Sequence, residues 1–180
     1  MTSNEQYFPH PRRIVTGHTL DGASTVLKDS EIPCLPTPIK CNFAVLYETH
    51  KFPASNDEPF VDPAEARTAS LANDSGVVLR VVDFPPRTET LYHRTVSLDF
   101  GILFEGEIDC HLDNGEVVHM KAGDVCVQRG TIHGWTNPHD KPARVYFILT
   151  AAEPIKIDGK PLGNAGFKHS EVESGGKQES

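Results

Sequence analysis

The sequence predicts an all-β protein with little helix. Roughly nine short apolar segments follow one another along the chain, and Gly, Pro and Asp-Asn-Gly turn signals separate them at close spacing. Helical periodicity is confined to one stretch, DPAEARTASL from Asp62, where Pro63 stands near the start and one or two turns are expected. This combination is typical of a β-barrel or a β-sandwich.

Several of these expected strands lie on either side of the central stretch. Residues 14–16 and 24–27 flank Asp21-Gly22, a hairpin signal. Further strands are expected at 42–49, 76–84, 143–151 and, as a short edge strand, 155–157. The Pro-rich segment 51–74 is interpreted either as a flap over a pocket mouth or as a solvated insertion.

Size and charge narrow the class of protein. A chain of 180 residues supports one domain with a sizeable core. The formal net charge of −8, with no basic cluster, argues against nucleic acid and anionic membranes as partners. No run reaches transmembrane length and the N-terminus has no apolar signal segment, so a cytoplasmic protein is expected. The four cysteines form no C-x-x-C pair and are interpreted as reduced and structural.

The organisation that follows from these patterns has four parts. Residues 1–10 are expected to be disordered, and residues 11–76 to form N-terminal strands and a Pro-rich loop that pack on a barrel. Residues 77–163 are expected to form the barrel itself, and the polar, Gly/Ser-rich residues 164–180 a disordered tail.

Polar side chains concentrate in the central stretch, residues 84–137. In a strand, alternate side chains share a face, which places His93 and Thr95 with Asp99. The turn at Arg129-Gly130 then presents His133, which would face His93 in a closed sheet. Two imidazoles and one carboxylate in an apolar cavity suit Fe(II), Zn(II), Ni(II) or Mn(II) with open positions. The same groups also suit acid–base work without any metal.

The order of these residues resembles the cupin family. The first cupin motif, G-x5-H-x-H-x(3,4)-E-x6-G, corresponds here to His93-x-Thr95-x3-Asp99-x6-Gly106. The second, G-x5-P-x-G-x2-H-x3-N, corresponds to GDVCVQRGTIHGWTN from position 123 to 137. The combined pattern HRT…D…GE and VQRGTxHxW resembles a single-domain branch of the family. The resemblance implies a double-stranded β-helix, or jelly-roll, barrel with extra N-terminal strands, and a homodimer.

Three departures from the motifs affect the ligand set that the resemblance implies. The second histidine of the family is Thr95 here, its glutamate is Asp99, and its proline is Gln128. Thr95 is a poor ligand for these ions, so either His93, Asp99 and His133 hold the metal with water, or no metal binds.

Three functions remain open for such a site. The first is an enzyme that acts on a small organic acid or polyketide-like metabolite by decarboxylation, dehydration or enolisation, with His93, Asp99 and His133 as catalytic groups. The second is a metal-dependent dioxygenase, and the third is a non-catalytic binder of a small ligand. The candidate substrate-binding residues are Arg80, Tyr92, Arg94, Thr95 and Trp135.

The remaining polar residues receive structural interpretations. Asp99 has an alternative role as an ion-pair partner of Arg94 or Arg129. His111 and His119 flank the Asp113-Asn114-Gly115 turn, and they are interpreted as a cross-strand surface pair and not as ligands.

Overall fold

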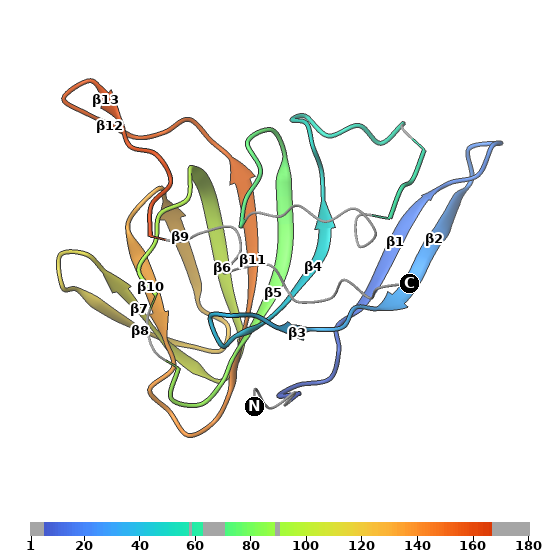
Figure 1. Cartoon of the computed structure of the whole chain (residues 1–180). Helices are drawn as coiled ribbons and strands as arrows, with labels where there is room; N and C mark the ends of the chain where they lie inside the picture. Colours follow the sequence, from blue (N-terminus) through green and yellow to red (C-terminus); the bar gives the residue numbers. More distant parts are fainter. Residues whose placement is uncertain (1–5, 58, 63–70, 89–90, 167–180) are drawn as a thin grey trace.

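A computed structural model describes residues 6–57, 59–62, 71–88 and 91–166 (Figure 1). All of its regular elements are strands, in agreement with the all-β prediction. Their bounds are β1 (Arg12–His18), β2 (Ser24–Glu31), β3 (Leu35–Pro36), β4 (Asn42–Glu48), β5 (Val77–Phe84), β6 (Ser97–Glu105), β7 (Glu107–Leu112), β8 (Val117–Lys121), β9 (Val125–Arg129), β10 (His133–Thr136), β11 (Ala143–Ala151), β12 (Lys156–Ile157) and β13 (Lys160–Pro161).

Two sheets enclose the main core. The larger has six strands in the order β3-β4-β5-β11-β6-β9, and the smaller has three in the order β10-β7-β8. Strand β11 lies in the middle of the larger sheet and pairs antiparallel with both β5 and β6. Buried side chains of both sheets share one cluster, among them Leu103, Ile108, Val145 and Trp135. This is the jelly-roll arrangement that the motif order implied (Figure 1).

Alternation along β5 separates two environments. Val78, Arg80 and Val82 point into the main core or its cavity, whereas Val81 and Asp83 point to the other face. That other face carries a second, smaller core, in which Val81 packs with Ile32, Cys34, Ala44 and Leu46. The two-sided burial explains why residues 76–84 read as a nearly continuous apolar run.

A buried ion pair holds the N-terminal segment to this outer face. Arg144 Nε and Nη2 donate to the two carboxylate oxygens of Asp83 at 2.6 and 2.8 Å. Nη1 of Arg144 donates to the carbonyl of Pro9 at 2.8 Å, and the guanidinium lies 4.9 Å from the ring centre of Phe8.

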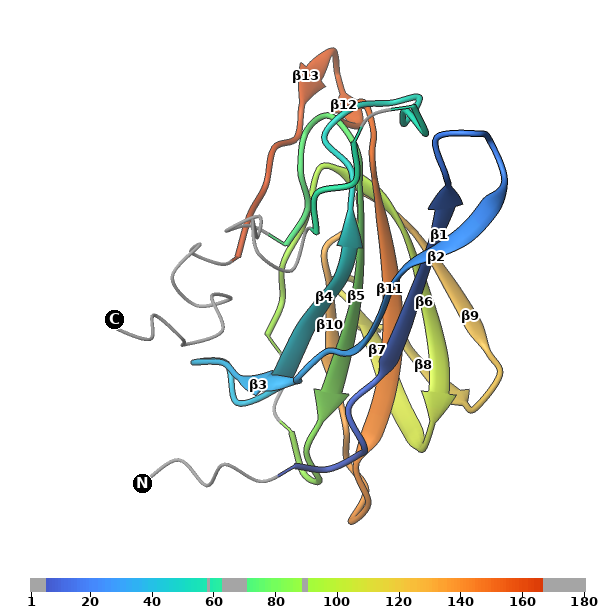
Figure 2. The ribbon, with the colours of Figure 1, turned by 90° about the vertical axis from the view of Figure 1, so that its right-hand side faces the viewer.

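The hairpin β1–β2 lies over the outer face of the large sheet, on the side away from β7 and β8 (Figure 1, Figure 2). It was expected from Asp21-Gly22, and Gly22 has a positive φ of 84°. Arg13 anchors it through two 2.7 Å hydrogen bonds to Asp62 and one of 3.0 Å to the carbonyl of Leu46.

The predicted division of the chain into four parts differs from the structure at two boundaries. Strand β4, which falls in the predicted 11–76 segment, belongs to the same sheet as β5. The predicted disordered tail begins with paired residues: Arg94 and Ala165 exchange hydrogen bonds of 2.9 and 3.0 Å, and the Val96 N–H donates to Asn164 at 2.7 Å. Residues 167–180 and the helical turns expected at 63–70 lie outside the described residues.

The described cysteines are all free thiols, as interpreted from their spacing. No helix in the described ranges is long and apolar enough to cross a bilayer.

Candidate functional site

A cavity of about 690 Å³, including the solvent at its mouth, opens between the inner face of the large sheet and β10. Most of its wall is apolar, and the polar groups are few. Its lining residues are Ile39, Cys41, Phe43, Leu71, Arg80, Val82, Phe84, Thr88, Leu91, His93, Asp99, Gln128, His133, Trp135, Phe147 and Leu149. An apolar cavity with a few polar groups is the usual form of a small-molecule site.

His93 and His133 stand side by side in this wall. Their backbones pair as an isolated antiparallel bridge, with N–H to carbonyl distances of 2.8 and 3.0 Å. The ring centroids are 4.4 Å apart and the ring planes are inclined by 60°. Because directly opposed residues of an antiparallel bridge present their side chains to the same face, the pairing itself brings the two imidazoles together.

Backbone carbonyls fix the orientation of both rings. Nδ1 of His93 lies 3.2 Å from the carbonyl of Leu91, and Nδ1 of His133 lies 3.1 Å from that of Thr131. A carbonyl only accepts, so each Nδ1 carries the proton when these contacts are hydrogen bonds. In the neutral tautomer the lone pair is then on Nε2.

Burial keeps both imidazoles neutral. It lowers the pKa of His93 below its ordinary value; the contact with the Leu91 carbonyl opposes this shift, and the positive charge of Arg80 adds to it. Burial also lowers the pKa of His133 to about 3, with a smaller contribution from His93.

Asp99 is held by hydroxyl groups. Thr95 Oγ1 donates to Asp99 Oδ2 at 3.1 Å, and Ser97 Oγ donates to Thr95 Oγ1 at 2.8 Å. The other oxygen, Oδ1, is buried and has no hydrogen-bond partner within the described part of the chain. Burial raises the pKa of Asp99, and the Ser97 and Thr95 hydroxyls and Arg80 oppose that shift.

Arg80 supplies the positive charge of the cavity. It is 4% exposed, and its guanidinium lies 5.6 Å from the ring centre of Phe43. Burial lowers its pKa to about 10, against the opposing effects of the Glu48 and Asp99 carboxylates, so it remains a cation at neutral pH. Two donors accompany it: among the described residues, neither Gln128 Nε2 nor Trp135 Nε1 finds a hydrogen-bond partner.

The candidate substrate-binding residues divide into two groups. Arg80 and Trp135 line the cavity, whereas Thr95 lies behind Asp99 as its hydrogen-bond donor. Tyr92 is 42% exposed, and neither it nor Arg94 is part of the cavity wall.

Several wall residues were not predicted as site residues. Phe43 of β4 and Phe147 of β11 were read only as parts of strands, although their alternation with outward residues could have assigned them to the inner face. The alternative ion pairs of Asp99 with Arg94 or Arg129 are not formed, because its oxygens face Thr95 and the cavity.

The fit of a metal ion to His93, Asp99 and His133 is incomplete. The residue types, the Nε2 lone pairs and the orphaned Oδ1 of Asp99 suit a dication. However, the three donor atoms do not all lie within 4.8 Å of one another; in the described ranges the group that does so is elsewhere. The guanidinium of Arg80 also places a positive charge near this position.

Comparison with known proteins identifies the class to which this barrel belongs. The family model described as "Cupin domain" matches residues 80–149, the part that carries β5 to β11. The chain is 35% identical to oryzines biosynthesis cluster protein J of Aspergillus oryzae, over 89% of this chain and 94% of that protein. The chain belongs to the cupin domain family.

Two further relatives have similar coverage. The chain is 39% identical to phomopsin biosynthesis cluster protein C' of Diaporthe leptostromiformis, over 85% of each protein. It is 32% identical to the cupin-domain-containing oxidoreductase fogC of Aspergillus ruber, over 83% of this chain and 77% of that protein.

Proposed function

We propose that the cavity is the active site of an enzyme that acts on a small organic acid or polyketide-like metabolite by acid–base chemistry. Decarboxylation, dehydration and enolisation are the reactions of this type. The observation that carries the proposal is the pair of adjacent imidazoles beside a buried guanidinium in an otherwise apolar cavity. The names of relatives from biosynthesis clusters support a substrate from secondary metabolism.

Arg80 is the proposed anion-binding group. A buried guanidinium offers paired N–H donors to a carboxylate, and it stabilises the negative oxygen of an enolate as that charge develops. Because the surrounding wall is apolar, little water competes for these donors. The unpaired N–H groups of Gln128 and Trp135 are further donors for oxygens of the same substrate.

His93 and His133 are the proposed proton-transfer groups. With Nδ1 bound to a carbonyl, each ring presents an Nε2 lone pair to the cavity. The negative charge of a bound carboxylate or enolate would raise the low pKa values of the two rings, so that Nε2 can accept a proton from carbon and return it. Transfer of the removed proton from one Nε2 to the adjacent Nε2 would allow removal at one substrate atom and delivery at another, as dehydration and isomerisation require. Asp99 Oδ1 is the proposed acceptor for a substrate hydroxyl.

Hydrogen exchange at carbon tests this function directly. The purified protein is incubated in D2O with a panel of small keto acids, hydroxy acids and phenolic acids, and NMR follows loss of the α-proton or of CO2. His133→Gln should slow the reaction about 10²- to 10⁴-fold, the usual contribution of a general acid or base. The exposed His18 provides a matched control, since His18→Gln should leave the rate unchanged. Equal rates for His133→Gln and the parent would refute the assignment.

A second candidate is a metal-dependent oxidoreductase, because several relatives, fogC among them, carry that name. His93, Asp99 and His133 would hold the ion, which would supply redox and Lewis-acid chemistry when bound. Elemental analysis of untagged protein together with oxygen uptake separates the two candidates. Stoichiometric iron that His93→Gln abolishes, with substrate-dependent oxygen uptake, would favour the oxidoreductase. Retention of a small ligand without turnover would favour a binding protein.

A homodimer is part of the same proposal. The hairpin β1–β2 forms a separate two-stranded sheet, and Ile14, Val26 and Leu27 on it are 52%, 55% and 40% exposed. Its outer edges pair with no other strand of the described chain, and pairing with a second copy would cover them. Light scattering of the parent protein should give a molar mass twice that of one chain. The Val26→Lys variant should have the mass of a single chain.

A further inference from the structure

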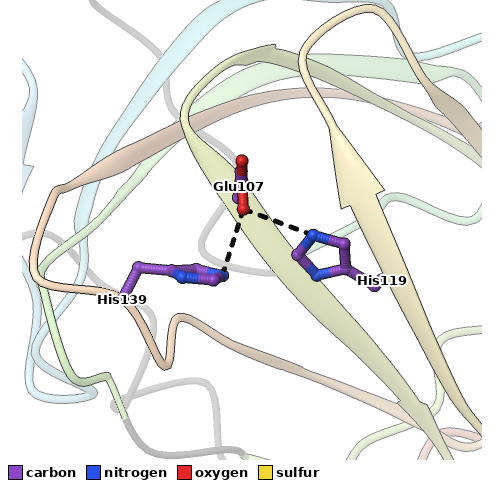
Figure 3. A group of neighbouring side chains, drawn as sticks. All are labelled: Glu107, His119 and His139. Atoms are coloured by element: carbon purple, nitrogen blue, oxygen red, sulfur yellow. Dashed lines mark ion pairs between the residues drawn. The ribbon is translucent and has the colours of Figure 1, made fainter.

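We propose that Glu107, His119 and His139 form a zinc-binding site on the outer surface of the barrel, separate from the cavity. Figure 3 shows the three side chains converging, with Glu107 between the two rings. Nε2 of His119 lies 3.3 Å from Glu107 Oε2, and Nε2 of His139 lies 3.7 Å from the same oxygen. One ligand atom from each residue lies within 4.8 Å of the other two.

The sheet register explains why two of these residues meet. Asp109 of β7 is directly opposite His119 of β8. Glu107 is two residues before Asp109 on the same strand, so it lies on the same face and diagonal to His119. The inward neighbours Ile108 and Met120 are buried in the core, which places Glu107 and His119 on the outside.

The third residue comes from the loop between β10 and β11, which is itself fixed. The His139 N–H donates to Asn137 Oδ1 at 3.0 Å, and the Arg87 N–H donates to the His139 carbonyl at 3.1 Å. Asn137 is fully buried, and its amide donates to the carbonyls of Pro85 and Lys141 at 3.0 and 2.8 Å. The backbone of His139 is therefore held in place before any ion binds.

The contacts within the group leave room for a cation. Nδ1 of His119 lies 2.8 Å from Asp109 Oδ1, so its proton points to that carboxylate and the Nε2 lone pair points to Glu107. Nε2 of His139 is buried and has no hydrogen-bond partner among the residues described. Carboxylate and imidazole acceptors thus face one another, an arrangement that a shared positive ion stabilises.

The spacing and the donor types indicate zinc or a similar first-row dication. Zinc–ligand bonds of about 2.1 Å in a tetrahedral arrangement place neighbouring donor atoms about 3.4 Å apart. The observed separations of 3.3 and 3.7 Å lie on either side of that value. Asp109 corresponds to the outer carboxylate that commonly orients a zinc-bound histidine. Glu107 and His119 are 48% and 42% exposed, so water would complete the coordination.

Zinc titration of untagged, EDTA-treated protein by calorimetry tests the site. His139→Ala should weaken zinc binding at least tenfold, and Asp109→Asn should weaken it about 10- to 100-fold, the usual effect of losing an orienting carboxylate. His18→Ala, at an exposed histidine of β1, should leave the dissociation constant unchanged. His93→Gln reports separately on any ion in the cavity and should also leave this site intact.

An anomalous difference map from a crystal soaked in zinc chloride locates the ion. A peak bonded to Glu107, His119 and His139 would support the proposal. A dissociation constant that His139→Ala leaves unchanged, or a peak only at other residues, would overturn it and would identify the group as an ion-pair cluster. Neither result bears on the acid–base reaction proposed for the cavity, because the two sites share no residue.

Discussion

The depressed pKa of His133 predicts a specific loss of stability in mild acid. Below pH 6.5 the unfolded chain protonates this imidazole, whereas the folded chain keeps it neutral until about pH 3. Because the folded-state pKa is below the unfolded value, the contribution of His133 to stability is fully present above pH 6.5 and is lost as the pH falls toward 3. One pKa unit is worth about 1.4 kcal/mol. With a shift from 6.5 to about 3, lowering the pH from 7 to 5 should remove about 2 kcal/mol from the free energy of unfolding.

Urea denaturation at pH 7 and pH 5, with EDTA present and far-UV circular dichroism as the probe, measures this loss. His133→Gln removes the titrating group, so the variant should lose about 2 kcal/mol less than the parent over the same interval. Burial raises the pKa of Asp99, so the titration of Asp99 changes stability in the opposite direction as the pH falls. Asp99 is present in both proteins, and its contribution therefore largely cancels in the comparison. His18→Gln should behave like the parent. An equal loss in the parent and in His133→Gln would show that His133 is not held neutral by burial.

Three further experiments test the packing and the anion site. In urea denaturation, Gly106→Ala should destabilise the protein by about 2 kcal/mol more than Gly115→Ala. Both glycines have a positive φ, but only at Gly106 would an added Cβ lie 2.6 Å from a backbone oxygen, that of Pro142. Arg144→Met should cost about 3–5 kcal/mol, and adding Asp83→Val should restore most of it, since the single change leaves a buried charge. Arg80→Met should abolish turnover of carboxylate substrates while a calorimetric melt still shows a folded protein.

The sheet could be predicted because its signals are local. Strand alternation, the Asp113-Asn114-Gly115 turn and the glycine at 106 each depend on a few adjacent residues. Gly106 and Gly115 indeed have positive φ values of 85° and 88°, and β11 has the predicted bounds Ala143–Ala151.

The polar cavity was only partly predictable because it depends on register between distant strands. Arg80 lies over Phe43 because β4 and β5 pair with Phe43 opposite Val82 and Val45 opposite Arg80, a register that no local pattern indicates. Tyr92 precedes His93 in the motif but is half exposed, since neighbours on one extended segment face opposite sides.

The surface group was missed for the same reason. His111 and His119 were interpreted as a cross-strand pair, and that interpretation is wrong. The register pairs His111 with Val117 and places Asp109 opposite His119. The ring of His111 instead lies 6.3 Å from that of Tyr92, in an edge-to-face contact. His139, from a loop after the motif, had no spacing that could link it to β7 or β8.

The two faces of the large sheet differ in how completely their buried polar groups are hydrogen-bonded. On the outer face, Arg144 and Asp83 are both buried, and each satisfies the other through two short hydrogen bonds. On the inner face, burial shifts the pKa of Arg80, His133 and Asp99 toward their uncharged forms, and Asp99 keeps an oxygen without a hydrogen-bond partner in the described structure. A buried carboxylate oxygen and the buried N–H groups of Gln128 and Trp135, which have no hydrogen-bond partner in the described structure, cost stability at that place. A ligand with complementary charge and hydrogen-bonding groups would remove that cost, which is why the cavity is the place to look for the substrate.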